Sequence, residues 1–401
     1  MKVNFVLSGM SRERFTAGQL IVLEHAHELA RRGHDVTLIP TIRSYRPEWF
    51  DVQVRLIEGP RVDLLGAAAR ATRALLGFFL SGRRNRPALT SACTDLSRQV
   101  AGRAQLAYTV AAMTDRLRQV IPPADVTLAT GFSTALPVWL CGSGVRAYFM
   151  QHHEVLFTAE LPEPEMAEAY ADLTYRLPLQ HIANCSWLVD TIADQYGSTP
   201  AALVLNAIDH RRYYPDGQPD GSPLTVVSYS GRAAPWKDLH TAARAIRIAR
   251  ETVPDLRWLV YGGPGLLPPD NVVAPYEAVG FLAPDALRRL YSRAHLLLAT
   301  SWYESFPLYP LEAMACGCAV ITTPFGTEDF AIDGHNARVV PPREPERMAA
   351  AIVELWRRPE LRAQLVAQAR EDAKRFNWAA SGDQLERTLT DMVAPLPGVT
   401  T

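Results

Sequence analysis

Two glutamates close to the start of one helix are the side chains of this sequence best suited to binding or chemistry. Glu304 and Glu312 lie in the segment 300–326, TSWYESFPLYPLEAMACGCAVITTPFG, directly after an apolar run that predicts a strand. Carboxylates accept hydrogen bonds from hydroxyl groups such as those of sugars. The alternative is a pair of solvated charges beside a helix, because a motif is a hypothesis until its context agrees.

The helix that follows supplies the second half of the predicted site. It is expected to begin near Pro307 or Leu308, where proline is tolerated, and to end at Gly317. The amide groups and the positive end of the helix dipole around residues 305–309 would face a diphosphate. A ligand whose phosphates lie between the two carboxylates, and whose hydroxyl groups bind these carboxylates, would be a nucleotide sugar.

Two basic residues occupy a comparable position earlier in the chain. Arg232 and Lys237 follow a buried strand predicted for residues 226–231 and precede a helix predicted for Leu239 to Arg250. Open α/β sheets bind ligands at the carboxyl ends of their strands, and a guanidinium together with an ammonium neutralises a pyrophosphate. The alternative is that both are solvated surface charges.

These motifs together resemble glycosyltransferase family 4, the retaining enzymes of the GT-B fold. The resemblance is carried by Glu304 and Glu312 with seven residues between them, then Ala313-Met314-Ala315-x-Gly317 and the strand 319–321. It implies an α/β fold of two Rossmann-like, doubly wound domains facing a central cleft. It also implies that Glu304 contacts the donor sugar, that Glu312 binds the ribose, and that Arg232 and Lys237 clamp the diphosphate. The donor-binding residues expected from it are Gly231, Arg232, Lys237, Tyr261, Gly262, Phe281, Glu304, Ser305, Phe306, Pro307, Leu308 and Glu312.

Two neighbouring histidines follow a strand predicted for residues 147–151. His152 and His153 would stand at the carboxyl end of that strand, where a cleft acid, base or donor belongs. The resemblance implies a histidine here that reaches the donor sugar, and His153 is preferred because an acidic residue follows it. The alternative is a polar loop or a packed pair. The catalytic candidates are therefore His153, His152, Glu304, Arg232 and Lys237.

The first residues predict a βαβ unit, with strands over 2–7 and 35–40 and a helix over 19–32. Gly9 and Gly18 are too far apart for a dinucleotide-binding fingerprint. The resemblance instead implies that this loop lies under the donor and near the acceptor. The expected acceptor or cleft residues are Gly18, Gln19 and Glu154.

Length and composition agree with two globular domains. We expect an acceptor domain over 1–215, a nucleotide-sugar domain over 216–377, and a last helix over 378–401 that crosses back to the first domain. A net charge of −1 gives no global field for nucleic acid. Five cysteines without metal-ligand spacing and the lack of a predicted signal peptide favour the reducing cytoplasm.

The segment 64–86, LLGAAARATRALLGFFLSGRRNR, leaves two alternatives open. It predicts either an amphipathic helix for peripheral contact with the inner face of a membrane or, as we favour, an ordinary helix packed on the first domain. Its apolar stretch is too short to span a bilayer.

The reaction implied is a retaining, metal-independent transfer from a nucleoside-diphosphate sugar, without any cofactor. The cleft motifs contain no Asp-x-Asp sequence for a metal. The sequence does not decide between dTDP-, UDP- and GDP-sugars as donors. It also does not decide between sugars, lipid-linked glycans and small molecules as acceptors. The run 148–157 is similar to a rhamnosyltransferase-like branch, although that branch usually has an acidic residue in place of His152. The rival functions are a catalytically silent partner subunit and an epimerase or phosphorylase of the same fold.

Overall fold

The structure, a computed structural model, describes residues 1–13, 16–42, 44–58, 106–159, 161, 163–219, 221, 223–231, 234–263 and 274–394. It divides into two compact units. The first comprises Met1–Ile182, Ile192–Ala202 and Glu386–Thr401, and the second comprises Ala183–Thr191 and Leu203–Leu385. The predicted helix over 64–86 and the predicted clamp residue Arg232 lie outside the described residues.

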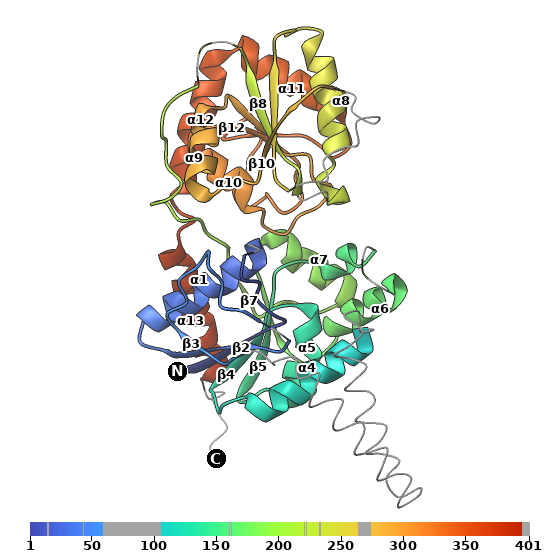
Figure 1. The fold of residues 1–401 in the computed structure, drawn as a ribbon, viewed down its shortest axis with the longest axis vertical. Helices are drawn as coiled ribbons and strands as arrows, with labels where there is room; N and C mark the ends of the chain where they lie inside the picture. The colour runs from blue at the N-terminus through green and yellow to red at the C-terminus, as the bar shows by residue number, and fades with distance from the viewer. Residues whose placement is uncertain are drawn as a thin grey trace, which may run out of the picture. The chain divides into compact units, whose positions relative to one another are not determined.

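The first unit is built on a seven-stranded sheet with the order β3-β2-β1-β4-β5-β6-β7 (Figure 1). The pairs of β1 with β2 and β4, of β2 with β3, and of β4 with β5 are parallel. The strands are β1 (Lys2–Leu7), β2 (Asp35–Pro40), β3 (Arg55–Leu56), β4 (Val126–Ala129), β5 (Val145–Met150), β6 (Gln180–Ala183) and β7 (Ala202–Leu203).

Helices connect and cover these strands, as expected for a doubly wound sheet. They are α1 (Ala17–Arg31), α4 (Leu106–Val120), α5 (Phe132–Cys141), the 3-10 helix η2 (Glu154–Phe157), α6 (Pro164–Thr174) and α7 (Ser186–Tyr196). Strands β1 and β2 each bury five of six residues, because both faces of a parallel sheet are covered. The predicted bounds of β1 and β2 are confirmed residue for residue.

The second unit has a six-stranded parallel sheet with the order β10-β9-β8-β11-β12-β13. Its strands are β8 (Thr225–Tyr229), β9 (Arg257–Tyr261), β10 (Glu277–Gly280), β11 (Leu296–Leu298), β12 (Ala319–Thr322) and β13 (Arg338–Val339). The order reverses between β8 and β11, so their carboxyl ends mark the topological switch point at which open sheets bind ligands.

In the second unit, the predicted helix over Leu239 to Arg250 is confirmed as α8, and the helix predicted from Pro307 or Leu308 is confirmed as α10. The helices of this unit are η4 (Pro235–Lys237), α8 (Leu239–Arg250), α9 (Pro284–Arg293), α10 (Leu308–Ala315), α11 (Pro345–Arg357), α12 (Pro359–Ala373) and α13 (Trp378–Val393). The first eight residues of α13 belong to the second unit and the rest to the first. Among the described residues, no helix is long and apolar enough to cross a membrane.

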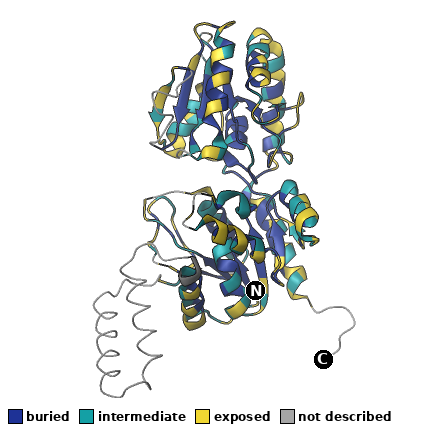
Figure 2. Ribbon diagram, turned by 90° about the vertical axis from the view of Figure 1, so that its right-hand side faces the viewer, coloured by how far each residue is buried: buried dark blue, intermediate teal, exposed yellow. Residues whose placement is uncertain are grey.

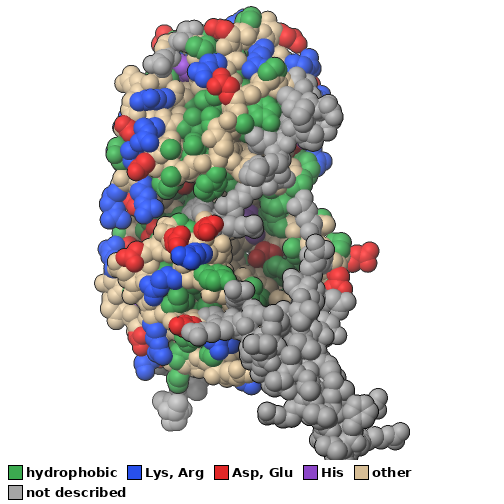
Figure 3. Space-filling view, viewed as in Figure 1, with side chains coloured by type: hydrophobic (Ala, Val, Ile, Leu, Met, Phe, Trp, Pro, Cys, Tyr) green, Lys and Arg blue, Asp and Glu red, His purple; other side chains and the backbone are tan. Residues whose placement is uncertain are grey.

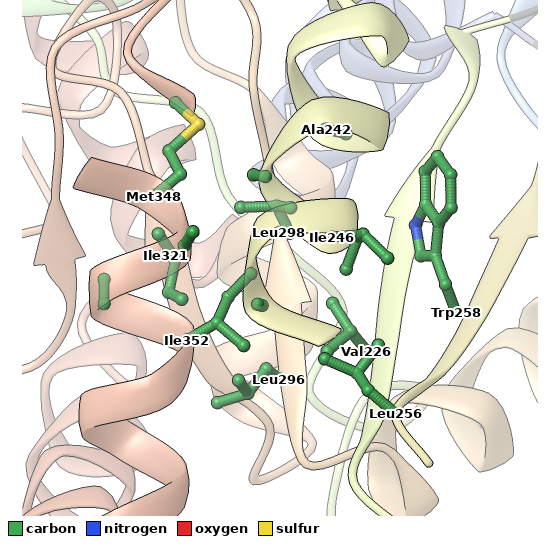
Figure 4. Packing of buried hydrophobic residues seen from close by; sticks show 14 of the residues in the cluster. Val226, Ala242, Ile246, Leu256, Trp258, Leu296, Leu298, Ile321, Met348 and Ile352 are labelled. Carbon is green, nitrogen blue, oxygen red and sulfur yellow. The ribbon is translucent and has the colours of Figure 1, made fainter. Parts of the chain in front are cut away.

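One hydrophobic cluster holds β8 and β11 in place. Side chains of α8 and α11 pack against the sheet, with Ile246 and Ile352 facing Val226, Leu298 and their neighbours (Figure 4). Trp258 of β9 is 1% exposed and donates its indole N–H to Ser228 Oγ at 3.1 Å. In both units the central strands are buried and the outer faces of the helices are exposed (Figure 2). The switch point is therefore carried by a rigid core.

Charges of both signs are interspersed on the face shown in Figure 3. This agrees with a formal net charge of −1. The visible surface therefore has no large field of one sign for a polyanion.

Candidate functional site

An ion pair between Lys237 and Glu304 lies at the switch point of the second sheet. Lys237 ends η4, which follows β8, and Glu304 lies in the loop between β11 and α10. Lys237 Nζ donates to Glu304 Oε1, and Ser301 Oγ donates to the same oxygen at 2.7 Å. The two charged side chains are only 12% and 6% exposed. The structure thus brings together two predicted site residues that lie far apart in the sequence.

Two tyrosine rings flank the ammonium of Lys237. Its Nζ is 5.2 Å from the ring centroid of Tyr229 and 4.9 Å from that of Tyr309. The hydroxyl of Tyr309 lies 3.2 Å from Ser301 Oγ. Burial, and secondly the charge of Glu304, raise the pKa of Tyr309. Rings at this distance attract a cation through their electron-rich faces, so they hold Lys237 in place.

Glu312 lies within α10 and is 8% exposed. Its carboxylate forms a hydrogen bond with the hydroxyl group of Tyr213, and burial raises its pKa to about 7. Sequence reasoning missed Tyr213, because it precedes the motif by almost a hundred residues. The carboxylate therefore changes charge near neutral pH.

The loop before α10 is held from several sides. Ser305 Oγ donates to Asn184 Oδ1 at 2.7 Å, and the Phe306 ring packs against Phe330 and Phe376 at 5.2 and 5.7 Å between centroids. Pro307 is the N-cap of α10, so the predicted helix start is confirmed. Because proline has no N–H, one amide in this stretch cannot bind an anion. Leu308 is the first residue of the helix and is buried.

Gly231 and Gly262 are placed where side chains do not fit. Gly231 has φ +58°, and an added Cβ would lie 2.3 Å from Lys237 Cγ. Gly262 has φ +129°, and an added Cβ would lie 2.2 Å from Ser230 Oγ. Both glycines therefore let the backbone pass close to the site, which is what positive φ and a missing side chain permit.

Tyr261 and Phe281 have different surroundings from each other. Tyr261 is 5% exposed, stacks on Tyr229 at 5.0 Å, and shares a 2.5 Å hydrogen bond with the hydroxyl of Tyr291. It supports the tyrosine that flanks Lys237. Phe281 follows β10 and is 57% exposed.

In the first unit, the two neighbouring histidines differ in burial. His153 is 3% exposed, its Nε2 lies 3.1 Å from the Tyr196 hydroxyl, and its ring packs against Tyr175. Burial lowers its pKa. His152 is only partly buried and packs on Phe157 at 4.4 Å. The packing therefore assigns His153 a structural position and leaves His152 the more accessible ring.

Glu154 uses its carboxylate within the first unit. Its Oε2 accepts hydrogen bonds from Phe132 N at 2.7 Å and from the Tyr148 hydroxyl. Burial raises its pKa to about 7. The expected cleft role is not what these contacts describe, because the carboxylate binds the first amide of α5.

The remaining predicted residues of the first unit lie at the start of α1. Gln19 Nε2 donates to Gly9 O at 2.7 Å, and an added Cβ on Gly18 would lie 3.0 Å from Gln151 Oε1. Within the described part of the chain, no group of three or more histidine, cysteine, aspartate or glutamate side chains is arranged to hold a metal ion.

One protein-family model matches the part of the chain that carries this site. Residues 225–358 match the family model "Glycosyl transferases group 1". The matched range lies within the second unit, which therefore resembles a group 1 glycosyltransferase domain. The matched range contains Lys237, Glu304 and Glu312. The predicted resemblance to glycosyltransferase family 4 is confirmed, whereas the rhamnosyltransferase-like branch stays a prediction.

Curated relatives match part of the chain. A D-inositol 3-phosphate glycosyltransferase of Rhodococcus opacus is 31% identical over 255 residues, which are 57% of this chain and 57% of that protein. The O-antigen biosynthesis protein RfbC of Myxococcus xanthus is 27% identical over 67% of this chain and 21% of its own length. The chain thus spans little more than half the length of the inositol phosphate relatives.

Solved structures match nearly the whole chain. A sucrose-phosphate synthase of Thermosynechococcus elongatus has a TM-score of 0.67 at 16% identity and covers 98% of both chains. HepE of Anabaena, solved with UDP-glucose, has a TM-score of 0.65 at 18% identity and covers 98% of this chain and all of its own. The chain therefore has the GT-B fold, as the sequence predicts.

Proposed function

We propose that the protein is a retaining glycosyltransferase that moves a sugar from a nucleoside-diphosphate sugar to an acceptor hydroxyl. The observation that carries this proposal is the juxtaposition of Lys237 with Glu304 at the switch point of a group 1 domain, with Glu312 one turn inside the adjoining helix. This places a cation for phosphate beside a carboxylate for hydroxyl groups.

Each side chain has a role in the proposed reaction. Lys237, with Arg232, binds the diphosphate together with the start of α10, while Glu304 accepts hydrogen bonds from the sugar and Glu312 from the ribose. The bond between the anomeric carbon and the β-phosphate oxygen breaks, and the acceptor oxygen bonds to the same face of that carbon. The acceptor proton passes to the leaving phosphate. Fixed positive charge stabilises the phosphate as it departs, and no metal ion is required in this scheme.

The comparisons suggest which substrates to try first. HepE was solved with UDP-glucose, and the curated relatives include proteins named for inositol 3-phosphate and for O-antigen biosynthesis. We therefore place UDP-sugars first among donors, followed by dTDP- and GDP-sugars. Inositol 3-phosphate and surface-glycan precursors are the first acceptors. A cytoplasmic location, with peripheral contact at a membrane, would suit a lipid-linked acceptor.

The test is a panel of these nucleotide sugars with the purified full-length protein. Binding is measured by calorimetry and nucleoside diphosphate release is measured with and without acceptor. A glycosyltransferase binds one donor and releases its nucleoside diphosphate faster with acceptor, and Lys237→Met weakens both. Retention is checked from the anomeric configuration of the product.

Other outcomes would favour the rival functions. Donor conversion to an epimer, or release that requires inorganic phosphate, would replace the proposal with an epimerase or a phosphorylase. Binding of no donor at all, by a protein that is folded, would favour a catalytically silent subunit.

A further inference from the structure

Glu304 balances the positive charge of Lys237. An anion that binds Lys237 must therefore compete with Glu304 for the ammonium group. Lys237 Nζ donates to Glu304 Oε1, and both side chains are almost fully buried. In surroundings of low polarity, separating two paired charges is strongly unfavourable unless each charge gains a new partner. The fate of Glu304 therefore affects every ligand that binds at Lys237.

When Lys237 binds a phosphate, the Glu304 carboxylate must find other hydrogen-bond donors nearby. Tyr229 and Tyr309 enclose the ammonium with their rings, which solvate a carboxylate poorly. Ser301 Oγ donates to Glu304 at 2.7 Å. Within the described part of the chain, this donor and Lys237 both use Oε1. A ligand that occupies Lys237 therefore leaves the carboxylate, as far as the described residues show, with the neutral donor Ser301 alone.

The nucleoside diphosphate and the nucleotide sugar carry the same diphosphate, but they differ in what they offer to Glu304. A nucleoside diphosphate brings negative charge next to an uncompensated carboxylate and has no hydroxyl group beyond the phosphates. The intact nucleotide sugar brings hydroxyl donors that replace the lysine on Glu304. The repulsion between carboxylate and phosphate is then offset only for the intact donor.

We propose that Glu304 is a specificity-determining residue that discriminates the nucleotide sugar from its own by-product, the free nucleoside diphosphate. Transfer of the sugar removes the hydroxyl donors, so Glu304 regains Lys237 and favours release of the diphosphate. This inference rests on the proposed function and deepens it, because it assigns the same site a way to limit product inhibition.

The test compares two ligands on two variants of the full-length protein. The probes are the nucleotide sugar bound most tightly in the donor panel and the matching nucleoside diphosphate, each titrated by calorimetry. For Glu304→Gln, which removes the charge and keeps the shape, we expect the nucleoside diphosphate to bind about tenfold more tightly, which is near the low end of measured couplings between close charges. The nucleotide sugar should not gain.

Ser301→Ala is the second variant, and its effect should have the opposite sign. It removes the neutral donor to Glu304, so the carboxylate depends more on Lys237 and the nucleoside diphosphate should bind more weakly than to the wild type. Glu346→Gln is the matched control, because Glu346 is an exposed glutamate of the same unit that pairs with Arg244 at 3.5 Å. Both affinities should be unchanged in it.

The outcomes separate the inference from the proposed function. If the wild type binds a nucleotide sugar, but Glu304→Gln binds the nucleoside diphosphate no more tightly than the wild type does, the inference is wrong and the proposed function stands. If Glu304→Gln does not fold, an unchanged or raised affinity of Ser301→Ala for the nucleoside diphosphate would overturn it instead. If the folded wild type binds neither ligand, the proposed function fails.

Discussion

At the scale of single residues, burial raises the pKa of Glu312, which its position in the motif does not indicate. Its pKa is raised to about 7 because the carboxylate lies in α10 with little access to water. The ionised form accepts hydrogen bonds from ribose hydroxyl groups at both oxygens, whereas protonation turns one of these oxygens into a donor and removes the negative charge. The proposed donor site therefore contains a group that titrates near neutral pH.

This predicts that nucleotide affinity rises with pH. Between pH 6 and pH 8 the ionised fraction of Glu312 changes from a minor to a major one, and the apparent affinity scales with the competent fraction, so we expect a gain of up to about tenfold. Calorimetric titration with the preferred nucleoside diphosphate measures it. Glu312→Gln should bind more weakly and lose this part of the pH dependence, which separates it from titration of the phosphate. Equal pH dependence in both proteins would contradict the assignment.

Glu154 predicts a pH effect on stability in the first unit. Its pKa is about 7 in the folded protein against an ordinary value of 4.5, because burial disfavours the charge. The folded state thus holds an extra proton between these values, and this contribution to the free energy of unfolding falls as pH rises from about 4.5 through 7. Glu154→Gln should reduce that fall by on the order of 2 kcal/mol in urea unfolding at pH 5 and pH 8. Glu168→Gln, an exposed position on α6, serves as the control, and a mutant curve parallel to wild type would refute the effect.

The sequence indicates residue pairs well where both members follow neighbouring strands. Lys237 and Glu304 meet because β8 and β11 are adjacent and each ends just before one of them. Tyr213 and Asn184 were not predictable in this way, since each reaches the site from a segment outside the motif. The sequence does not indicate which of His152 and His153 is the more buried, because adjacent residues point in different directions and only packing decides it.

At the scale of elements, the loop before α10 is shaped by a segment that follows β12. Gly326 has φ +79°, and an added Cβ would lie 2.4 Å from Glu304 O and 2.5 Å from Glu304 C. Both atoms are backbone, so they have little freedom to move aside. The loop carrying Glu304 therefore depends on a glycine that the motif analysis did not single out, since a turn glycine gives no signal of what it touches.

Gly326→Ala should displace this loop. We expect a loss of about 2–3 kcal/mol in the free energy of unfolding, from strain at positive φ together with the overlap, and weaker binding of the nucleotide sugar. Gly334→Ala is the matched control, because Gly334 has φ +71° and nothing within 4 Å of an added Cβ. It should show the smaller strain cost alone, with donor affinity kept. Equal losses in the two variants would mean that the contact with Glu304 has no effect.

At the scale of the whole molecule, the chain forms two compact units that each have a parallel sheet of their own. The predicted strands and helices of both sheets agree with the structure because continuous apolar runs and glycine stops are local signals. The membership of segments in the two units is not local. Residues 183–191 belong to the second unit through contacts such as Ser186 N with Asp329 Oδ2 at 2.9 Å, and no pattern within that segment indicates its partner.

The division into units predicts where nucleotide binding stabilises the protein. The proposed diphosphate, sugar and ribose contacts all lie in the second unit, and a ligand at 100 times its dissociation constant stabilises the state that binds it by about 2.7 kcal/mol. Hydrogen exchange of the full chain with saturating nucleoside diphosphate should therefore slow in peptides covering β8 and residues 301–315. Peptides covering β1 and β2 should change less, because no proposed contact to this ligand comes from them. Lys237→Met under the same conditions should lose the protection, and slowing confined to the first unit would place the nucleotide elsewhere than on Lys237 and Glu312.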